Sequence, residues 1–251
     1  MKILAITQAR YASSRLPGKV LKTVGQETLL AIHLKRILQS KLITKLKVAT
    51  TLEPEADRIV AISNKLGVES FRGSIDNVLE RFYLTAQSEK PDYVVRLTAD
   101  CPLIDSVEID RVIETCLNGG YDYASNSLEL TFPDGIDVEV FKFSALEKAY
   151  REATLKSDRE HVTSYIWRNS SLKGGKMFSS FCLRYSEDFS KYRLTVDTQE
   201  DFILIEKLIS RLGSDKAWRD YVNYLEKNPE LVEINAKYQR NEGYQKSLKQ
   251  D

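Results

Sequence analysis

The first 120 residues alternate short apolar runs with segments whose apolar residues recur at helical spacing, and this alternation constrains the fold more than any other feature. Strand-like runs lie at 2–7, 46–50, 68–71 and 93–97, and helical patterns lie at 29–38, 55–66, 78–86 and about 106–117. Strands that alternate with helices pair in parallel through right-handed crossovers. The sequence therefore predicts an α/β fold with a mostly parallel central sheet flanked by helices, which binds ligands at the carboxyl ends of its strands.

The second half of the chain is less regular. Its pattern predicts a strand at 137–143, helices at 144–152 and 158–168, and a strand at 177–183, followed by amphipathic helices at 200–212 and near 218–225. No repeat, low-complexity tract or linker interrupts it. We therefore predict a single domain over 1–251, with a substrate-side or dimerisation region at about 127–190 and a helical C-terminal extension at about 214–251.

Composition excludes several classes of protein. The 251 residues carry 37 Lys and Arg against 36 Asp and Glu, a net charge of +1 that argues against general binding to nucleic acid or an anionic membrane. The apolar run at the N-terminus is too short for a signal peptide, and no run approaches the roughly 18 apolar residues of a membrane span. Three cysteines without CxxC spacing indicate neither a disulfide framework nor a cysteine-rich zinc site. A cytoplasmic location is the expectation.

A basic loop, QARYASSRLPGK at 8–19, follows the first strand. Arg10, Arg15 and Lys19 supply three cations, and Ser14 is one of two adjacent hydroxyls. Such a loop at the carboxyl end of a strand can bind the charges of a nucleoside triphosphate. It matches neither the P-loop nor the dinucleotide-binding fingerprint. Taken alone, it fits a solvated basic loop about as well.

Two carboxylates follow strand-like segments elsewhere in the chain. Asp100 lies in RLTADCPLID just after the most strand-like run, and Asp197 lies in RLTVDT before the helix predicted at 200–212. Mg²⁺ takes one or two protein carboxylates and completes its coordination with phosphate and water. Either aspartate alone is typical of a turn or a helix cap. Combined with the basic loop, the pair favours a magnesium site.

Seven segments, spread over nearly the whole chain, carry a family resemblance. They are QARYASSRLPGKVL (8–21), FRGSIDNVLERF (71–82), VVRLTADCPLID (94–105), PDGIDVEVF (133–141), DREHVTSYI (158–166), RLTVDTQEDF (193–202) and NEGYQKSL (241–248). With them the chain resembles the cytidylyltransferase family that includes the CMP-sialic acid and CMP-Kdo synthetases, and within it the spore coat polysaccharide biosynthesis protein F branch.

The resemblance implies a glycosyltransferase-A-like nucleotide-binding fold and the reaction of CTP with a sugar acid, a nonulosonic acid, to give a CMP-sugar and pyrophosphate for surface polysaccharide or glycan synthesis. It also implies Mg²⁺ as cofactor and a homodimer. Sialic acid synthetases have a longer acidic signature than the single Asp197 at the second metal position, which argues against sialic acid itself.

Site residues carry over from the resemblance by matching position. The implied triphosphate-binding residues are Arg10, Ser14, Arg15 and Lys19; those near the cytidine are Arg72 and Ser74; the metal ligands are Asp100 and Asp197; those on the sugar side are Asp134, Asp137, Glu139 and His161. In the implied mechanism a sugar hydroxyl attacks the α-phosphorus, and the catalytic residues stabilise the phosphate charge. These catalytic residues are Arg15, Lys19, Asp100 and Asp197.

Some interpretations stay open from sequence. His161 is equally a structural residue or a substrate contact, and it is a candidate general base. His33 and Cys101 are interpreted as structural. A metal-dependent glycosyltransferase that uses a nucleotide-sugar is one alternative function, although the basic loop fits a triphosphate better. A nucleotide-binding regulatory module without turnover is the other.

Overall fold

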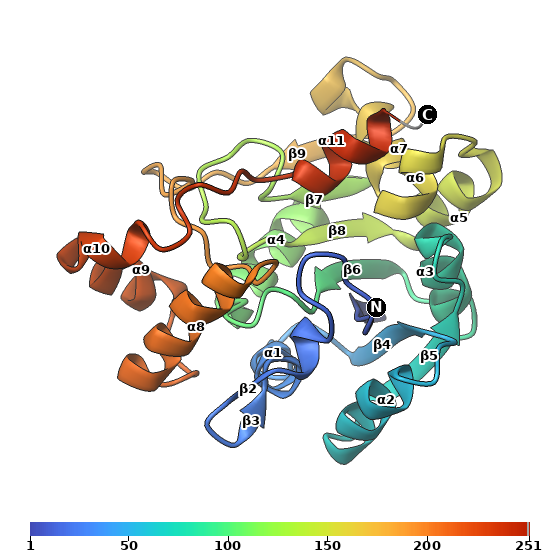
Figure 1. Cartoon of the computed structure of the whole chain (residues 1–251). Helices are drawn as coiled ribbons and strands as arrows, with labels where there is room; N and C mark the ends of the chain where they lie inside the picture. The colour runs from blue at the N-terminus through green and yellow to red at the C-terminus, as the bar shows by residue number, and fades with distance from the viewer. Residues whose placement is uncertain (250) are drawn as a thin grey trace.

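One sheet of seven strands organises the part of the chain that the computed structural model describes, residues 1–249 and 251 (Figure 1). The strand order is β5-β4-β1-β6-β8-β7-β9. The strands are β1 (Ile3–Gln8), β4 (Lys45–Thr51), β5 (Glu69–Gly73), β6 (Tyr93–Thr98), β7 (Tyr123–Ser125), β8 (Glu139–Lys142) and β9 (Ser180–Cys182). Only β8 runs antiparallel to its neighbours, β6 and β7. The predicted mostly parallel sheet is confirmed.

Helices cover both faces of the sheet (Figure 1). They are α1 (Leu29–Ile37), α2 (Ala56–Lys65), α3 (Val78–Gln87), α4 (Ser106–Asn118), α5 (Phe143–Glu152), α6 (Lys156–His161), α7 (Ser164–Arg168), α8 (Gln199–Leu212), α9 (Trp218–Lys227), α10 (Pro229–Val232) and α11 (Glu242–Leu248). Several begin at side-chain caps, as at Asn77 before α3 and Asp105 before α4. A small hairpin, β2 (Thr23–Val24) and β3 (Glu27–Thr28), was not expected from the sequence.

Side chains that alternate along the strands contribute to two hydrophobic cores, one on each face of the sheet. Ala5 and Val95 pack with α1, α2 and α4, whereas Ile6 and Val94 pack with α3 and α5 on the other face. A third cluster joins α8 and α9 to the loops around Phe132 and Leu194. From α10 the chain returns across the molecule to α6, against which α11 packs (Figure 1). The single-domain organisation stays a prediction.

The helix predicted over 158–168 is wrong, because two short helices occupy the segment. Helix α6 ends at His161, Val162 has a positive φ of 62°, and α7 begins at Ser164. A β-branched residue is a rare occupant of this backbone region. The Thr163 hydroxyl donates to the buried Glu139 carboxylate (2.6 Å), a tertiary contact that outweighs the local helical pattern.

The strand-like interpretation of residues 193–197 is also wrong. The segment is extended, but its only ladder contact in the described chain is one isolated bridge between Asp134 and Arg193. It packs instead on the loop that follows β6, where the Val196 N–H donates to the Asp100 carbonyl oxygen (2.7 Å). No helix in the described residues is long and apolar enough to cross a membrane.

Candidate active site

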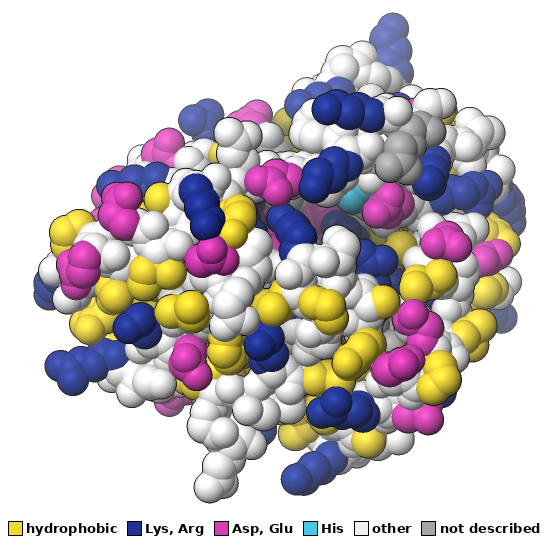
Figure 2. Space-filling view, viewed as in Figure 1, with side chains coloured by type: hydrophobic (Ala, Val, Ile, Leu, Met, Phe, Trp, Pro, Cys, Tyr) yellow, Lys and Arg dark blue, Asp and Glu magenta, His cyan; other side chains and the backbone are white. Residues whose placement is uncertain are grey.

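The site lies where the parallel strands end. β1 ends at Gln8 and β6 at Thr98, and the N–H of Ala99 donates to the Gln8 carbonyl oxygen (3.0 Å), so the loops that follow these strands begin side by side. One loop carries the predicted phosphate-binding cations and the other carries Asp100. In the space-filling view, acidic and basic side chains gather around a recess near the middle of the displayed face (Figure 2).

Asp100 and Asp197 meet at the ammonium group of Lys19. Lys19 Nζ donates to Asp100 Oδ2 (2.8 Å) and to Asp197 Oδ1 (2.7 Å). The backbone fixes this meeting, because both the Val196 N–H (2.7 Å) and the Thr195 hydroxyl (3.1 Å) donate to the Asp100 carbonyl oxygen. Residues separated by almost one hundred positions in sequence therefore share one cation.

The three charges stabilise one another. Burial alone would lower the pKa of Lys19, but the Asp100 and Asp197 carboxylates outweigh it and the net shift is upward. Burial alone would likewise raise the pKa of Asp100, whereas Lys19 holds it well below the usual range. Near neutral pH the ammonium and the Asp100 carboxylate are therefore both charged.

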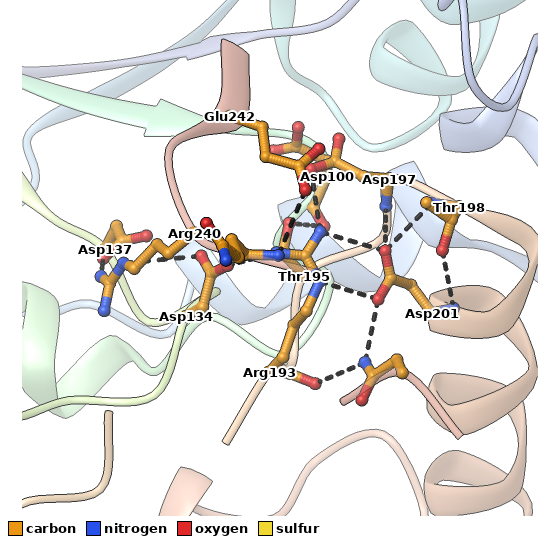
Figure 3. A network of polar contacts seen from close by, with 12 residues as sticks. Asp100, Asp134, Asp137, Arg193, Thr195, Asp197, Thr198, Asp201, Arg240 and Glu242 are labelled. Carbon is orange, nitrogen blue, oxygen red and sulfur yellow. Dashed lines mark hydrogen bonds and ion pairs between the residues drawn. The ribbon is translucent and has the colours of Figure 1, made fainter. Parts of the chain in front are cut away.

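The second oxygen of Asp197 faces two more cations. Arg15 lies 2.9 Å and Arg193 3.1 Å from Asp197 Oδ2. Arg193 is anchored in turn by the fully buried Asp201 (2.8 Å), which also accepts from the backbone N–H groups at the start of α8 (Figure 3). Arg15 also pairs with Glu242 (3.1 Å), at the start of α11.

The sugar-side aspartates belong to the same network (Figure 3). Asp134 pairs with Arg193 (2.5 Å), and Asp137 pairs with Arg240, which lies in the return segment before α11. Burial, together with the neighbouring Asp137 carboxylate, raises the pKa of Asp134 to about 7 despite these two arginines. The structure thus brings the two predicted metal ligands, two of the four predicted phosphate-binding residues (Arg15 and Lys19) and the two sugar-side aspartates into one polar cluster.

The cluster has an excess of negative charge. Its ion pairs connect six carboxylates with only four cations, so the cluster has between one and two excess negative charges near pH 7, where Asp134 is partly protonated. No group of three or more His, Cys, Asp or Glu side chains within the described residues is arranged to hold a metal ion. Two carboxylates, Asp100 and Asp197, are what Mg²⁺ needs from a protein when phosphate and water supply its other ligands. The residues present therefore fit a divalent cation that arrives with a nucleotide.

The nucleotide-side residues form a separate corner. Arg72, at the end of β5, donates to the carbonyl oxygens of Thr51 (2.9 Å) and Glu53 (2.7 Å), and Ser74 accepts from the Asn77 N–H. Ser14 is exposed. Neither Arg72 nor Ser74 bonds to the Lys19 cluster in the described part of the chain.

Arg81 in this corner is influenced by the charge of Arg10. Burial, with the nearby charge of the exposed Arg10, lowers the pKa of Arg81 to about 10. The guanidinium of Arg81 donates to the Ser74 carbonyl oxygen (2.5 Å) and has no carboxylate partner among the described residues. Two neighbouring cations without an acid between them favour a bound anion.

Glu139 and His161, the other two residues predicted for the sugar side, have partners already. Glu139 accepts from the hydroxyls of Tyr123 and Thr163 (both 2.6 Å) and pairs with Arg96. His161 Nε2 lies 2.9 Å from the Ser247 hydroxyl of α11. Burial lowers the pKa of His161, and the charge of Arg96 acts in the same direction.

Six residues that the sequence did not single out also take part in these polar contacts. These are Arg81, Arg96, Arg193, Asp201, Arg240 and Glu242. All but Arg240 fall inside the seven segments that carry the family resemblance, so the resemblance could have indicated these five. Arg240 directly precedes the last of those segments, and its partners come from a loop about one hundred residues earlier.

An open α/β sheet with a charged cluster at the carboxyl ends of its strands is typical of nucleotide-binding enzymes, and the fold and site of this chain have both features. The cytidylyltransferase family model matches residues 4–244. The chain is 40% identical over 241 residues to the uncharacterized protein MJ1063 of Methanocaldococcus jannaschii, covering 94% of this chain and 95% of that one. It is 35% identical over 239 residues to the spore coat polysaccharide biosynthesis protein SpsF of Bacillus subtilis, covering 92% and 96%.

Solved structures agree with these matches. A cytidylyltransferase from Leptospira borgpetersenii superposes with a TM-score of 0.87 at 36% identity, covering 95% of this chain and 100% of that one. A CMP-2-keto-3-deoxy-manno-octonic acid synthetase solved with CTP has a TM-score of 0.63 at 14% identity over 84% of this chain and 99% of that one, which shows a shared fold. The chain belongs to the cytidylyltransferase family. Nucleotidyl transfer is therefore favoured over the glycosyltransferase alternative.

Proposed function

We propose that the protein transfers CMP from CTP to a sugar acid, a nonulosonic acid, with release of pyrophosphate, in the synthesis of a surface polysaccharide or glycan. The family match supports the cytidylyl transfer. The relative named for spore coat polysaccharide biosynthesis supports the pathway. Relatives named 3-deoxy-manno-octulosonate cytidylyltransferase, which match about half of the chain, support a keto-acid acceptor.

One observation carries the proposal: Lys19 bridges Asp100 and Asp197 beside Arg15. In this arrangement the phosphate-binding cations pair with the metal-binding carboxylates. When CTP and Mg²⁺ enter together, Lys19 and Arg15 exchange carboxylate oxygens for phosphate oxygens, and both sets of charges stay compensated. Asp100 and Asp197 would hold Mg²⁺, which would supply Lewis-acid polarisation of a phosphate oxygen. Lys19 and Arg15 then neutralise the departing pyrophosphate.

His161 is the candidate acceptor for the proton of the attacking hydroxyl. Its lowered pKa keeps the imidazole neutral near pH 7, which is the form that can take up a proton. His161 lies 2.9 Å from Ser247 of α11, and the charges of Arg96 and Glu139 influence its pKa, which supports assigning these residues to one side of the site. A homodimer and a cytoplasmic location belong to the proposal as predictions.

Pyrophosphate release tests the proposed function. The purified chain is mixed with Mg²⁺, each of the four nucleoside triphosphates and a panel of nonulosonic and other 2-keto-3-deoxy acids. We expect release only when CTP, Mg²⁺ and a suitable acid are present together, with formation of the CMP-sugar. CTP binding without turnover across the whole panel would support the regulatory-module alternative instead.

A further inference from the structure

Side chains in the carboxyl half of the central strand β6 are less completely covered than those in its amino half. Val94 is fully buried under α3 and α5, but Arg96 and Thr98, farther along the same face of the strand, are partly exposed. Side chains of a strand between two neighbours are normally covered on both faces in such a sheet. This end of β6 is therefore partly open to solvent, and we call the uncovered stretch at Arg96 and Thr98 the β6 opening.

Arg96 is held rigidly in this opening. Its Nη1 donates to Glu139, whose other oxygen accepts from Tyr123 and Thr163 (both 2.6 Å). Glu139 is only 6% exposed, so these three donors saturate a buried carboxylate. Glu139 is thereby committed to fixing the guanidinium and has little capacity left for a sugar hydroxyl.

One edge of the guanidinium has nothing to bind. Nε of Arg96 is buried and has no hydrogen-bond partner in the described chain, and no bond to Nη2 occurs there either. Buried donors are nearly always paired in folded proteins, so this unpartnered edge indicates a missing acceptor. The Nε and Nη2 groups of arginine match the two oxygens of a carboxylate in a planar, bidentate arrangement.

The neighbours of Arg96 place this free edge on the acceptor side of the site. Its charge influences His161, and α11 covers His161 through Ser247 (2.9 Å) and Tyr244. Arg15 and Lys19 of the basic loop, by contrast, pair with Asp197 and Asp100. Two further cations near the sugar-side aspartates are already occupied: Arg240 pairs with Asp134 and Asp137, and Arg193 pairs with Asp134 and Asp201.

We propose that Arg96 binds the carboxylate of the acceptor and thereby selects sugar acids over neutral sugars. This role rests on the proposed function, because only a sugar-acid acceptor brings a carboxylate to the sugar side. Glu139 is then a positioning residue for Arg96.

Binding calorimetry separates this role from a structural one. The enzyme is saturated with Mg²⁺ and a non-hydrolysable CTP analogue and titrated with 3-deoxy-manno-octulosonate and a panel of nonulosonic acids, each as the free acid and as its methyl ester. We expect the acid to bind roughly 10- to 100-fold more tightly than its ester, since the ester loses the charge-assisted bidentate pair. Arg96→Gln should bring this ratio to about one, and Arg96→Lys should leave a reduced preference.

Matched variants guard against misfolding. Arg168→Gln also removes an arginine that pairs with a buried acid, Asp158, and also has an unpartnered Nε, so it should leave the acid-to-ester ratio unchanged. Arg96→Gln combined with Glu139→Gln avoids a buried, unpaired carboxylate, and it should show the same ratio of about one if the single variant unfolds.

The outcomes are distinct. An unchanged preference for the acid in the Arg96 variants, equal binding of acid and ester by the wild type, or a loss of analogue affinity in Arg96→Gln would overturn the role of Arg96. Preferential acid binding without pyrophosphate release from CTP would overturn the proposed function and leave the carboxylate site standing. Failure of every acid to bind would overturn both.

Discussion

The backbone N–H of Val196 donates to the carbonyl oxygen of Asp100 (2.7 Å) and ties two loops that are far apart in sequence. The bond sets Asp197 beside Asp100 without any sheet pairing of its own. The Lys19 ammonium completes the contact, 2.8 Å and 2.7 Å from the two carboxylates. A candidate metal site is thus assembled by backbone geometry before any ligand arrives.

Replacing either aspartate should abolish most turnover. We expect Asp100→Asn and Asp197→Asn each to lower kcat for pyrophosphate release by roughly 10²- to 10³-fold, because each removes a charge that would hold Mg²⁺ against the phosphates. Thermal unfolding should show that both variants fold. Asp188→Asn, which changes a loop carboxylate that contacts Ser190, is the control and should keep its activity. Near-normal rates in both site variants would refute the metal assignment.

Lys19 should compete with the metal in the absence of nucleotide. Its ammonium occupies the position between the two carboxylates, so Lys19→Met should bind Mn²⁺ alone more tightly than the wild type does, as measured by electron paramagnetic resonance or calorimetry. The same variant should lose CTP affinity and turnover, because the pyrophosphate then lacks a cation. Lys35→Met, at an exposed pair with Glu27, should change neither property. Unchanged Mn²⁺ affinity in Lys19→Met would argue against the Lys19 ammonium and the metal ion occupying the same position between the two carboxylates.

The parallel half of the fold could be predicted because each strand and helix there has its own periodic signal. Residues 93–97 and 106–117 were expected as a strand and a helix, and they form β6 and α4 with nearly the same bounds. The single helix predicted over 158–168 is wrong because the Thr163 contact with Glu139 is tertiary and has no periodic signal in the sequence. β7 was missed because a strand of three residues is too short to show alternation.

The candidate site likewise contains residues that the sequence could predict and residues that it could not. Lys19 and Asp100 follow runs that form β1 and β6, so their convergence at one edge of the sheet could be expected. Asp197 was expected there from a run that is not a strand, and the Val196 bond to Asp100 brings it there instead. The contacts of Arg193 and Arg240 could not be expected. The first depends on a bridge between two loops, and the second depends on the return of the C-terminal segment across the site. Such contacts depend on tertiary packing and not on local pattern.

Gly135 should be required for the site to assemble. Its φ is +105°, and a Cβ there would lie 2.6 Å from the backbone carbonyl carbon of Leu194 and from the backbone nitrogen of Thr195. Gly135→Ala should therefore displace the segment that carries Asp197, lower the free energy of unfolding by about 1–3 kcal/mol and reduce kcat. Gly174→Ala is a matched control, because Gly174 also has a positive φ (+77°) but has open space around its Cβ position. Equal activity losses in the two variants would contradict this explanation.

His33 should make stability depend on pH through a buried hydrogen-bonded bridge. Its Nδ1 lies 2.8 Å from the Cys101 carbonyl oxygen, which can only accept, so Nδ1 carries the proton and Nε2 accepts from the Thr7 hydroxyl (2.7 Å). Burial lowers the pKa of His33 from 6.5 to about 4. The unfolded chain therefore takes up this proton first as the pH falls, and about 3 kcal/mol of stability is lost between pH 6.5 and pH 4.

Urea unfolding at a series of pH values measures this loss. His33→Asn should be less stable than the wild type at pH 7.5, because the bridge between Thr7 and Cys101 is weakened, but its stability should fall less steeply between pH 6.5 and pH 4. His161, the second histidine, has a lowered pKa as well, so His161→Asn is measured in parallel to subtract its share. Identical pH profiles for the wild type and His33→Asn would contradict the buried neutral imidazole.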